Sequence, residues 1–269
     1  MNLGTRMKSW WLAALLLASC LLNPGLASAN NYQDMWWNPN ESGWGINIAQ
    51  QGDVMFATWF IYGQSNQPTW IFLSSATRSG ASGNTFAGDI FQASGSAFSA
   101  VPFVPLQASN LTNVGRASLI FADSRTGTLT YSINGIEVVK QITRLNVGAF
   151  NLTGSYFGGL KREGGGCVSA ALNGSVLNQA IYSVTHSVAT GALTITEIGG
   201  TSCTFSGTTT TFGSLVEGAG RFTCAGENII GAWTMREGRP SPNAFTALLT
   251  LRPDSDSCTL TATIGGLKP

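Results

Sequence analysis

The amino-acid sequence predicts an all-β protein made of two consecutive antiparallel β-meander domains. Short runs rich in β-branched and aromatic residues recur along the chain, and Gly, Asn, Asp and Ser bound them. Beyond the first residues, apolar side chains do not repeat at helical spacing, and glycine interrupts every candidate helix. Roughly 240 residues follow the N-terminal segment, which suits two domains of about 120 residues better than one.

The N-terminal segment before Asn30 is predicted to be a cleavable signal peptide. Arg6 and Lys8 precede an uncharged apolar run, Trp10–Leu22, which is shorter than the about 20 residues of a membrane span. The small residues of Ala27–Ala29 fit the positions that signal peptidase recognises. We therefore expect a secreted or periplasmic protein without a membrane span, starting at Asn30.

A lipoprotein is the alternative. Leu17–Cys20 resembles a lipobox, in which Cys20 is acylated and becomes the first residue of the mature chain. The residues that follow, Leu21–Pro24, do not form the polar tether usual after such a cysteine. The pattern favours cleavage before Asn30, and anchoring through Cys20 stays open.

The first domain is predicted at residues 30–147. Trp44–Ile48 alternates between its two faces, and Gln51–Asp53 supplies the next turn. The following strand, Val54–Tyr62, is apolar on both faces, which predicts a central strand covered on both sides. Further strands are expected at 69–73, 117–122, 128–134 and 136–145.

The second domain is predicted at residues 151–269 and begins with Leu152–Tyr156, a glycine followed by an aromatic residue. Small up-and-down barrels of the avidin and lipocalin type begin in a similar way, so this half resembles them. About eight strands would suit a closed barrel, which has no exposed edges, and a sandwich is the alternative. The expected strands are 167–173, 179–187, 192–198, 203–209, 220–224, 229–235, 244–251 and 258–264.

Four cysteines fall in the second half: Cys167, Cys203, Cys224 and Cys258. An even number in an exported chain predicts two disulfides, with three possible pairings. No closely spaced Cys or His pair is present, so a metal site is not expected.

The charge pattern excludes some partners. Without Arg6 and Lys8, 12 basic and 13 acidic residues leave the chain nearly neutral. No basic run could attract nucleic acid, and no cofactor is expected. An outer-membrane barrel is rejected, because Thr, Ser and Gly populate both faces of the strands and the last residues include no aromatic.

One motif carries a family resemblance. A W-x-P-x-E-S-G-W-G pattern spans Trp37–Gly45, and a T-W-F strand follows at Thr58–Phe60. The chain resembles exported proteobacterial proteins that carry this type of domain, alone or attached to larger secreted enzymes. Asn134–Gly135 and Lys140–Arg144 look like its closing strand. The resemblance covers about residues 35–146 and implies no assigned activity.

Catalysis finds little support in the sequence. The chain has one histidine, His186, and no G-x-S-x-G elbow, so a serine triad is not expected. Glu41 with Asp53, or with Asp34, could form the carboxylate pair of a glycosidase. Alternatively, Asp53 is a turn residue and Glu41 bonds to the backbone of its own loop, which we favour.

The tryptophans suggest a binding function. Five of the six tryptophans after Asn30 lie between positions 36 and 70. Trp44 and Trp59 are predicted to be core residues, since they have apolar neighbours in strands. Adjacent residues of a strand point to opposite faces, so Trp36 and Trp37 cannot both point inward. The candidate binding residues are Trp36, Trp37, Trp70 and Glu41.

The preferred hypothesis is therefore a non-enzymatic binding or structural module that recognises a glycan or another extracellular polymer. The first alternative is a secreted hydrolase that uses Glu41 and an aspartate. The second alternative is an inhibitor or escort of a secreted enzyme. An exposed aromatic row would favour binding, and two carboxylates facing each other in a cleft would favour hydrolysis.

Overall fold

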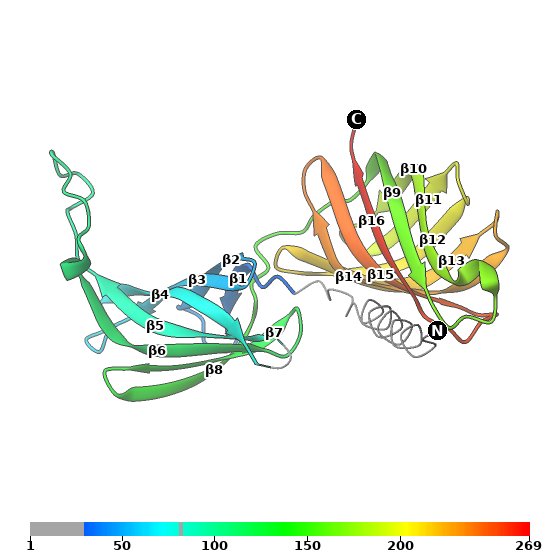
Figure 1. Cartoon of the computed structure of the whole chain (residues 1–269). Helices are drawn as coiled ribbons and strands as arrows, with labels where there is room; N and C mark the ends of the chain where they lie inside the picture. The colour runs from blue at the N-terminus through cyan, green and yellow to red at the C-terminus, as the bar shows by residue number, and fades with distance from the viewer. Residues whose placement is uncertain (1–29, 81–82) are drawn as a thin grey trace, which may run out of the picture. The chain divides into compact units, whose positions relative to one another are not determined.

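The computed structural model describes residues 30–80 and 83–269. The predicted signal peptide, with Cys20, lies outside the described residues. The described chain forms two successive closed antiparallel barrels (Figure 1). The predicted all-β fold with two consecutive meanders is therefore confirmed, and each meander closes on itself.

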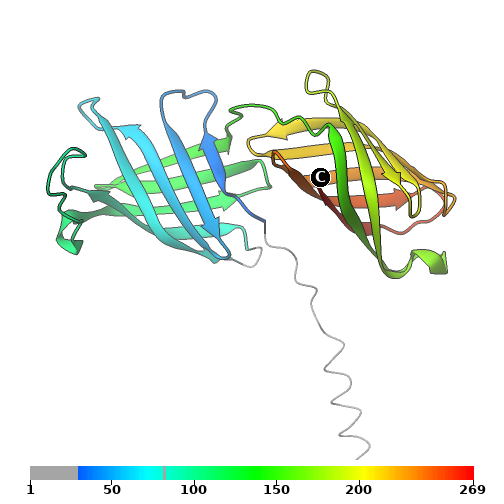
Figure 2. The ribbon, with the colours of Figure 1, turned by 90° about the horizontal axis from the view of Figure 1, so that it is seen from above.

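Barrel 1 contains eight strands that pair in sequence order (Figure 2). A 3-10 turn, η2 (Ala108–Asn110), precedes the sixth strand. The strands are β1 (Asp34–Trp37), β2 (Gly45–Gln51), β3 (Val54–Tyr62), β4 (Pro68–Ser79), β5 (Thr85–Ala93), β6 (Leu111–Phe121), β7 (Thr126–Ile133) and β8 (Ile136–Arg144).

The short strand β1 closes barrel 1. One of its edges pairs with β2, where Trp36 lies opposite Ile46. Its other edge pairs with β8, where Trp36 lies opposite Arg144 and Trp37 lies opposite Thr143. Every strand therefore has a partner on both edges, which removes the exposed edges that promote aggregation.

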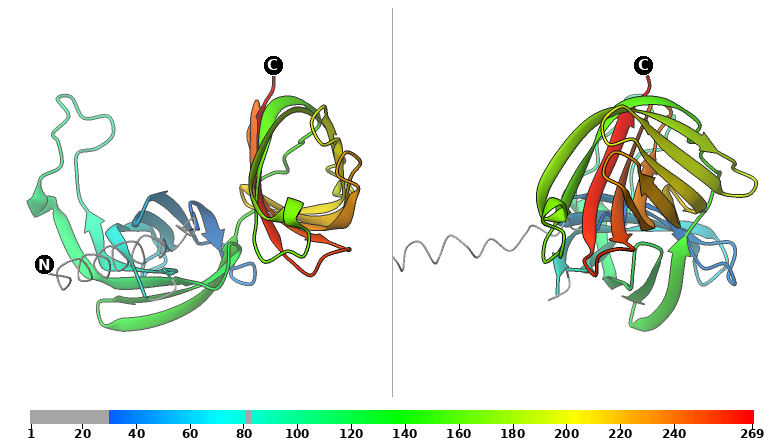
Figure 3. Two further views of the ribbon diagram at one scale, coloured as in Figure 1. Left: turned by 45° about the vertical axis from the view of Figure 1, so that its right-hand side comes forward. Right: turned by 90° about the vertical axis from the view of Figure 1, so that its right-hand side faces the viewer.

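Barrel 2 has the same order, with β16 returning to pair with β9 (Figure 3). The predicted closed barrel is thus present, and the sandwich alternative is not. The strands are β9 (Gly154–Gly164), β10 (Gly174–His186), β11 (Ala192–Ile198), β12 (Cys203–Phe212), β13 (Leu215–Cys224), β14 (Ile229–Pro240), β15 (Ala244–Pro253) and β16 (Leu260–Leu267).

Each barrel is filled by its own apolar core, because inward positions alternate with outward ones along every strand. In barrel 1 the largest buried side chains include Trp36, Trp59, Phe86 and Phe121. The core of barrel 2 includes Tyr156, Tyr182, Phe205, Phe222 and Trp233.

Two disulfides join elements of barrel 2. Cys203 and Cys224 lie directly opposite each other on β12 and β13. Cys167 joins Cys258, 91 positions along the chain. The prediction of two disulfides is confirmed, and the pairing that the sequence left open is now assigned.

Two predicted segments differ from the structure. Val54–Tyr62 forms β3, but its outward side chains are exposed rather than covered, because a closed barrel has only one interior face. The strand expected at 167–173 is a loop with the 3-10 turn η3 (Ala170–Leu172). There, the Asn173 side chain bonds to both the N–H and the carbonyl of Cys167, which folds the segment back on itself.

Candidate binding surface

Five aromatic side chains form a continuous strip on the outer face of barrel 1, across β3, β4 and β5. Phe60 lies opposite Trp70 in the β3–β4 register, and Phe72 lies opposite Phe91 in the β4–β5 register. The Phe72 ring centroid is 5.8 Å from those of Phe56 and Trp70 and 5.9 Å from that of Phe91, in stacked geometry. We call these five residues, Phe56, Phe60, Trp70, Phe72 and Phe91, the aromatic strip.

The aromatic strip is open to solvent. Phe56, Phe60 and Trp70 have exposed fractions of 45%, 57% and 47%. Phe72, at the centre of the strip on β4, is half-buried, and so is Phe91 on β5. The two rings cover part of each other by stacking. Scattered exposed apolar residues are ordinary, but a contiguous patch with polar surroundings marks an interaction site.

A polar side chain accompanies the strip. Thr58 lies between Phe56 and Phe60 along β3, opposite Phe72. Its side chain points to the same outer face, because Ala57 and Trp59 on either side of it are buried inward residues. The surface therefore combines aromatic rings with a hydroxyl group that can exchange hydrogen bonds with a ligand.

The outer wall of barrel 1 has a different composition at β7. On β7, Gly127 and Leu129 point inward and are buried, so the outward positions are Thr126, Thr128 and Thr130. Threonine therefore covers the part of the outer wall formed by β7. Exposed apolar side chains also occur elsewhere on the outer wall, such as Ile120 on β6 and Val139 on β8, but the stacked rings lie on β3, β4 and β5.

The structure distributes the predicted tryptophans between core and surface. Trp36 and Trp59 lie inside barrel 1, with exposed fractions of 0% and 1%. Trp44 is partly buried and packs against the same core. Trp37 is half-buried on β1, and Trp70 belongs to the aromatic strip. Of the predicted binding residues, only Trp70 lies in this strip, and buried Trp36 is not available to an external ligand.

Glu41 fastens the loop between β1 and β2 to β8. Its carboxylate pairs with the Lys140 ammonium at 2.6 Å and accepts a hydrogen bond from the Trp44 indole N–H at 3.2 Å. The Lys140 ammonium also lies 5.9 Å from the Trp44 ring centroid. Gly43 supports this loop with φ at 111°, a conformation that glycine adopts without strain. The central residues of the W-x-P-x-E-S-G-W-G motif thus hold the barrel seam together.

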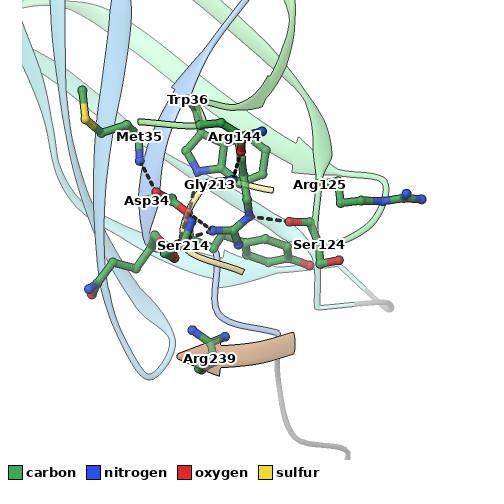
Figure 4. Close-up of polar contacts among 12 residues, drawn as sticks. Asp34, Met35, Trp36, Ser124, Arg125, Arg144, Gly213, Ser214 and Arg239 are labelled. Carbon is green, nitrogen blue, oxygen red and sulfur yellow. Dashed lines mark hydrogen bonds and ion pairs between the residues drawn. The ribbon is translucent and has the colours of Figure 1, made fainter. Parts of the chain in front are cut away.

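Arg144 has a similar role at the other end of the same seam (Figure 4). Its side chain is completely buried and pairs with Asp34 at 2.7 Å. The guanidinium also donates to the Ser124 carbonyl at 2.5 Å and lies 4.9 Å from the Trp36 ring centroid. Desolvation by burial lowers the pKa of Arg144, and the Asp34 carboxylate opposes that effect.

The acidic residues do not form a glycosidase pair. Glu41 binds Lys140, Asp53 binds Arg78 at 2.7 Å, and Asp34 binds Arg144, so each carboxylate has its own cation. The hydrogen bond from Lys140 lowers the pKa of Glu41, whereas a general acid requires a raised pKa.

His186 is bound to groups that do not form a triad. Its Nδ1 accepts a hydrogen bond from the Leu152 N–H at 3.3 Å, and its Nε2 lies 3.0 Å from the Thr209 hydroxyl. Desolvation by burial lowers the pKa of His186. The imidazole therefore joins β10 to the segment before β9 and to β12.

In barrel 2, a carboxylate and a small cavity lie close to the two disulfides. Asp256 lies beside Cys167 and Cys258, but the two sulfurs are bonded to each other and the carboxylate accepts backbone N–H bonds from Val168 and Ser169. A cavity near the Cys203–Cys224 disulfide has a volume of about 30 Å³, which suits water rather than an organic cofactor.

Sequence reasoning missed four of the five strip residues: Phe56, Phe60, Phe72 and Phe91. The available signal was the run of apolar residues on both faces of β3 together with outward phenylalanines on β4 and β5. For Val54–Tyr62 the sequence predicts burial on both faces, since covered strands show the same pattern.

Comparison with known proteins adds little. No family model matches the sequence, and no curated protein matches it. A solved structure described as a "putative outer membrane protein" from Bacteroides fragilis covers 89% of this chain and 98% of its own length, with 11% identity and a TM-score of 0.31. At that score the similarity supports no conclusion about function.

Proposed function

We propose that this protein is a non-enzymatic binding module that recognises an extracellular glycan through the aromatic strip of barrel 1. The observation that carries the proposal is the continuous row of aromatic rings on β3, β4 and β5, of which Phe56, Phe60 and Trp70 are exposed. Aromatic anchors dominate binding energy at interfaces because they bury a large rigid area at low entropic cost.

The open geometry favours an extended polymer over a small molecule. Small-molecule sites are concave and enclose most of their ligand. The strip instead crosses three adjacent strands on the outer wall of a barrel, so a ligand would lie along it. Thr58 would supply hydrogen bonds to sugar hydroxyl groups beside the rings.

The two alternatives have less support. The hydrolase hypothesis needs paired carboxylates, and those of Glu41, Asp53 and Asp34 are each engaged by a different cation. An inhibitor or escort of a secreted enzyme would also need an exposed surface, and it would bind a protein instead of a glycan.

Export fits the proposal. The two disulfides are typical of an extracellular or periplasmic protein, because cytosolic thiols are kept reduced. A glycan outside the cytoplasm would then be accessible to the aromatic strip. Release by cleavage before Asn30 is the localisation that we propose, with anchoring through Cys20 as the alternative.

A glycan array with the purified exported protein tests the proposal, followed by titration of any ligand found. Trp70→Ala should reduce affinity at least tenfold, which corresponds to about 1.4 kcal/mol. Ile120→Ala is the matched control, since Ile120 is an outward residue of β6 with an exposed fraction of 46%, close to that of Trp70.

Absence of glycan binding would refute the proposal, as would a Trp70→Ala variant that binds as tightly as the unmodified protein. Hydrolysis of the bound glycan would favour the enzyme alternative. Binding to a secreted enzyme with no glycan binding would favour the inhibitor alternative.

A further inference from the structure

A second exposed apolar feature lies outside the aromatic strip, in residues 94–107 between β5 and η2. We call this segment the apolar loop. It contains no charged residue, and its five large apolar side chains are half to fully exposed. They are Phe98 (99%), Val101 (96%), Phe103 (60%), Val104 (60%) and Leu106 (50%).

The apolar loop satisfies part of its own backbone. The Ser96 hydroxyl donates to the Val104 carbonyl at 3.1 Å and accepts from the Val104 N–H at 3.2 Å. Ala100 N–H donates to the Ala97 carbonyl at 3.0 Å. These bonds form between residues of the loop, which projects beyond the strand ends of barrel 1 (Figure 1). The exposed side chains therefore lie on a protruding, internally bonded tip.

Other exposed residues lie at the same end of barrel 1. The register places Tyr62, at the end of β3, beside Pro68 at the start of β4. Ile136, at the start of β8, belongs to the hairpin that pairs with the first half of β6. Tyr62 and Ile136 have exposed fractions of 58% and 53%. Tyr62 fits a position at a membrane–water interface, because a tyrosine has both an apolar ring and a polar hydroxyl.

The chemistry of the loop favours a lipid surface over a protein partner. Protein interfaces combine apolar anchors with a polar rim and about ten direct hydrogen bonds. The loop presents apolar side chains on a convex tip, carries no charge and uses its Ser96 hydroxyl internally. A bilayer boundary accepts such a tip without shape complementarity, provided that backbone groups are paired.

We propose that the apolar loop inserts into a lipid surface and holds barrel 1 against a membrane. Among the described residues, no helix is long and apolar enough to span a bilayer. The proposed contact is peripheral, through Phe98, Val101 and Phe103 at the tip. Because the loop is uncharged, binding should not require anionic lipids and should change little with salt.

Sedimentation with vesicles of zwitterionic phosphatidylcholine, which has no net charge, tests the inference on the purified exported protein. Phe98→Ser/Val101→Ser should reduce the vesicle partition coefficient at least tenfold, since apolar area drives interfacial binding. Phe157→Ser/Val168→Ser is the matched control, because it also removes one exposed phenylalanine and one exposed valine, from barrel 2.

A second measurement reports insertion directly. An environment-sensitive dye on Val101→Cys should shift its emission to shorter wavelength when vesicles are added, and a dye on Leu177→Cys, at an exposed position of β10, should not. The four native cysteines of barrel 2 are paired in disulfides, so the new thiol is the one that reacts.

Glycan binding by the aromatic strip and lipid binding by the apolar loop can be tested independently of each other. Phe98→Ser/Val101→Ser should keep glycan affinity, and Trp70→Ala should keep vesicle binding. Vesicle binding that is absent, or unchanged in Phe98→Ser/Val101→Ser, would overturn the lipid inference. Concentration-dependent dimerisation that the same substitutions abolish, without a dye shift on vesicles, would assign the loop to a second copy of the chain and also overturn it.

Discussion

At the scale of single residues, two ion pairs lie on either side of the β1–β8 seam. The ladder between β1 and β8 has two registered pairs. Arg144 with Asp34 fastens one end of this seam, and Lys140 with Glu41 fastens the other. The motif residues therefore have a structural reason to be present, independent of any ligand.

Trp36 and Trp70 should respond in opposite ways to truncation. Trp36→Ala removes a completely buried ring that packs on Phe121 and Arg144, and should lower the free energy of unfolding of barrel 1 by about 3–5 kcal/mol. Trp70→Ala removes an exposed ring and one stacking contact, and should cost about 1 kcal/mol or less. Urea denaturation of both variants measures the difference. Equal losses would show that the aromatic strip is part of the folding core.

His186 should make barrel 2 less stable in mild acid. Because burial lowers its pKa in the folded protein, the unfolded chain binds the proton more strongly. The stability due to neutral His186 is therefore fully present above the unfolded pKa, about 6.5, and is lost as pH falls below it. Protonated Nδ1 could no longer accept from the Leu152 N–H.

Urea denaturation at pH 7.5 and 5.5 checks this prediction. His186 is the one histidine of the chain, so His186→Gln should flatten the pH dependence across that window. A variant with the same pH dependence as the unmodified protein would contradict the assignment to this imidazole.

At the scale of elements, β-rich runs bounded by turn residues predicted most strands, but not β1 or β5, and the failures have identifiable causes. Inward and outward positions of β2 follow the predicted pattern of Trp44–Ile48 closely. In β3 the outward Phe56 and Phe60 are as apolar as the inward Met55 and Trp59. A sequence pattern does not distinguish a second covered face from an exposed binding face, so burial was the wrong prediction there.

Loops were harder to predict than strands. The segment 167–173 has strand composition, but a side-chain bond from Asn173 to the Cys167 backbone replaces ladder pairing. The apolar loop has no strand periodicity, since Pro102 and Pro105 interrupt it. The loop does contain five large apolar residues in a segment that cannot join a sheet. The sequence does not predict whether such residues are buried or exposed.

At the scale of the whole molecule, the two barrels are stabilised differently. Barrel 1 has no cysteine and contains five tryptophans, two of which are fully buried in its core. Barrel 2 contains one tryptophan, Trp233, and both disulfides. This uneven distribution lets two probes follow the barrels separately: tryptophan fluorescence is dominated by barrel 1, and thiol chemistry reports only on barrel 2.

Reduction should therefore destabilise barrel 2 and spare barrel 1. A disulfide stabilises by about 2–4 kcal/mol, mainly by restricting the unfolded chain, and more for longer loops. Cys167–Cys258 closes a separation of 91 residues and Cys203–Cys224 one of 21, so Cys167→Ser/Cys258→Ser should cost more than Cys203→Ser/Cys224→Ser. Once the disulfides are reduced, the thiols of barrel 2 should become reactive at a lower urea concentration than the one at which the tryptophan fluorescence of barrel 1 changes. The midpoint of that fluorescence transition should be the same as in the unreduced protein. A fluorescence midpoint that falls together with the thiol transition would mean that the two barrels unfold as one cooperative unit.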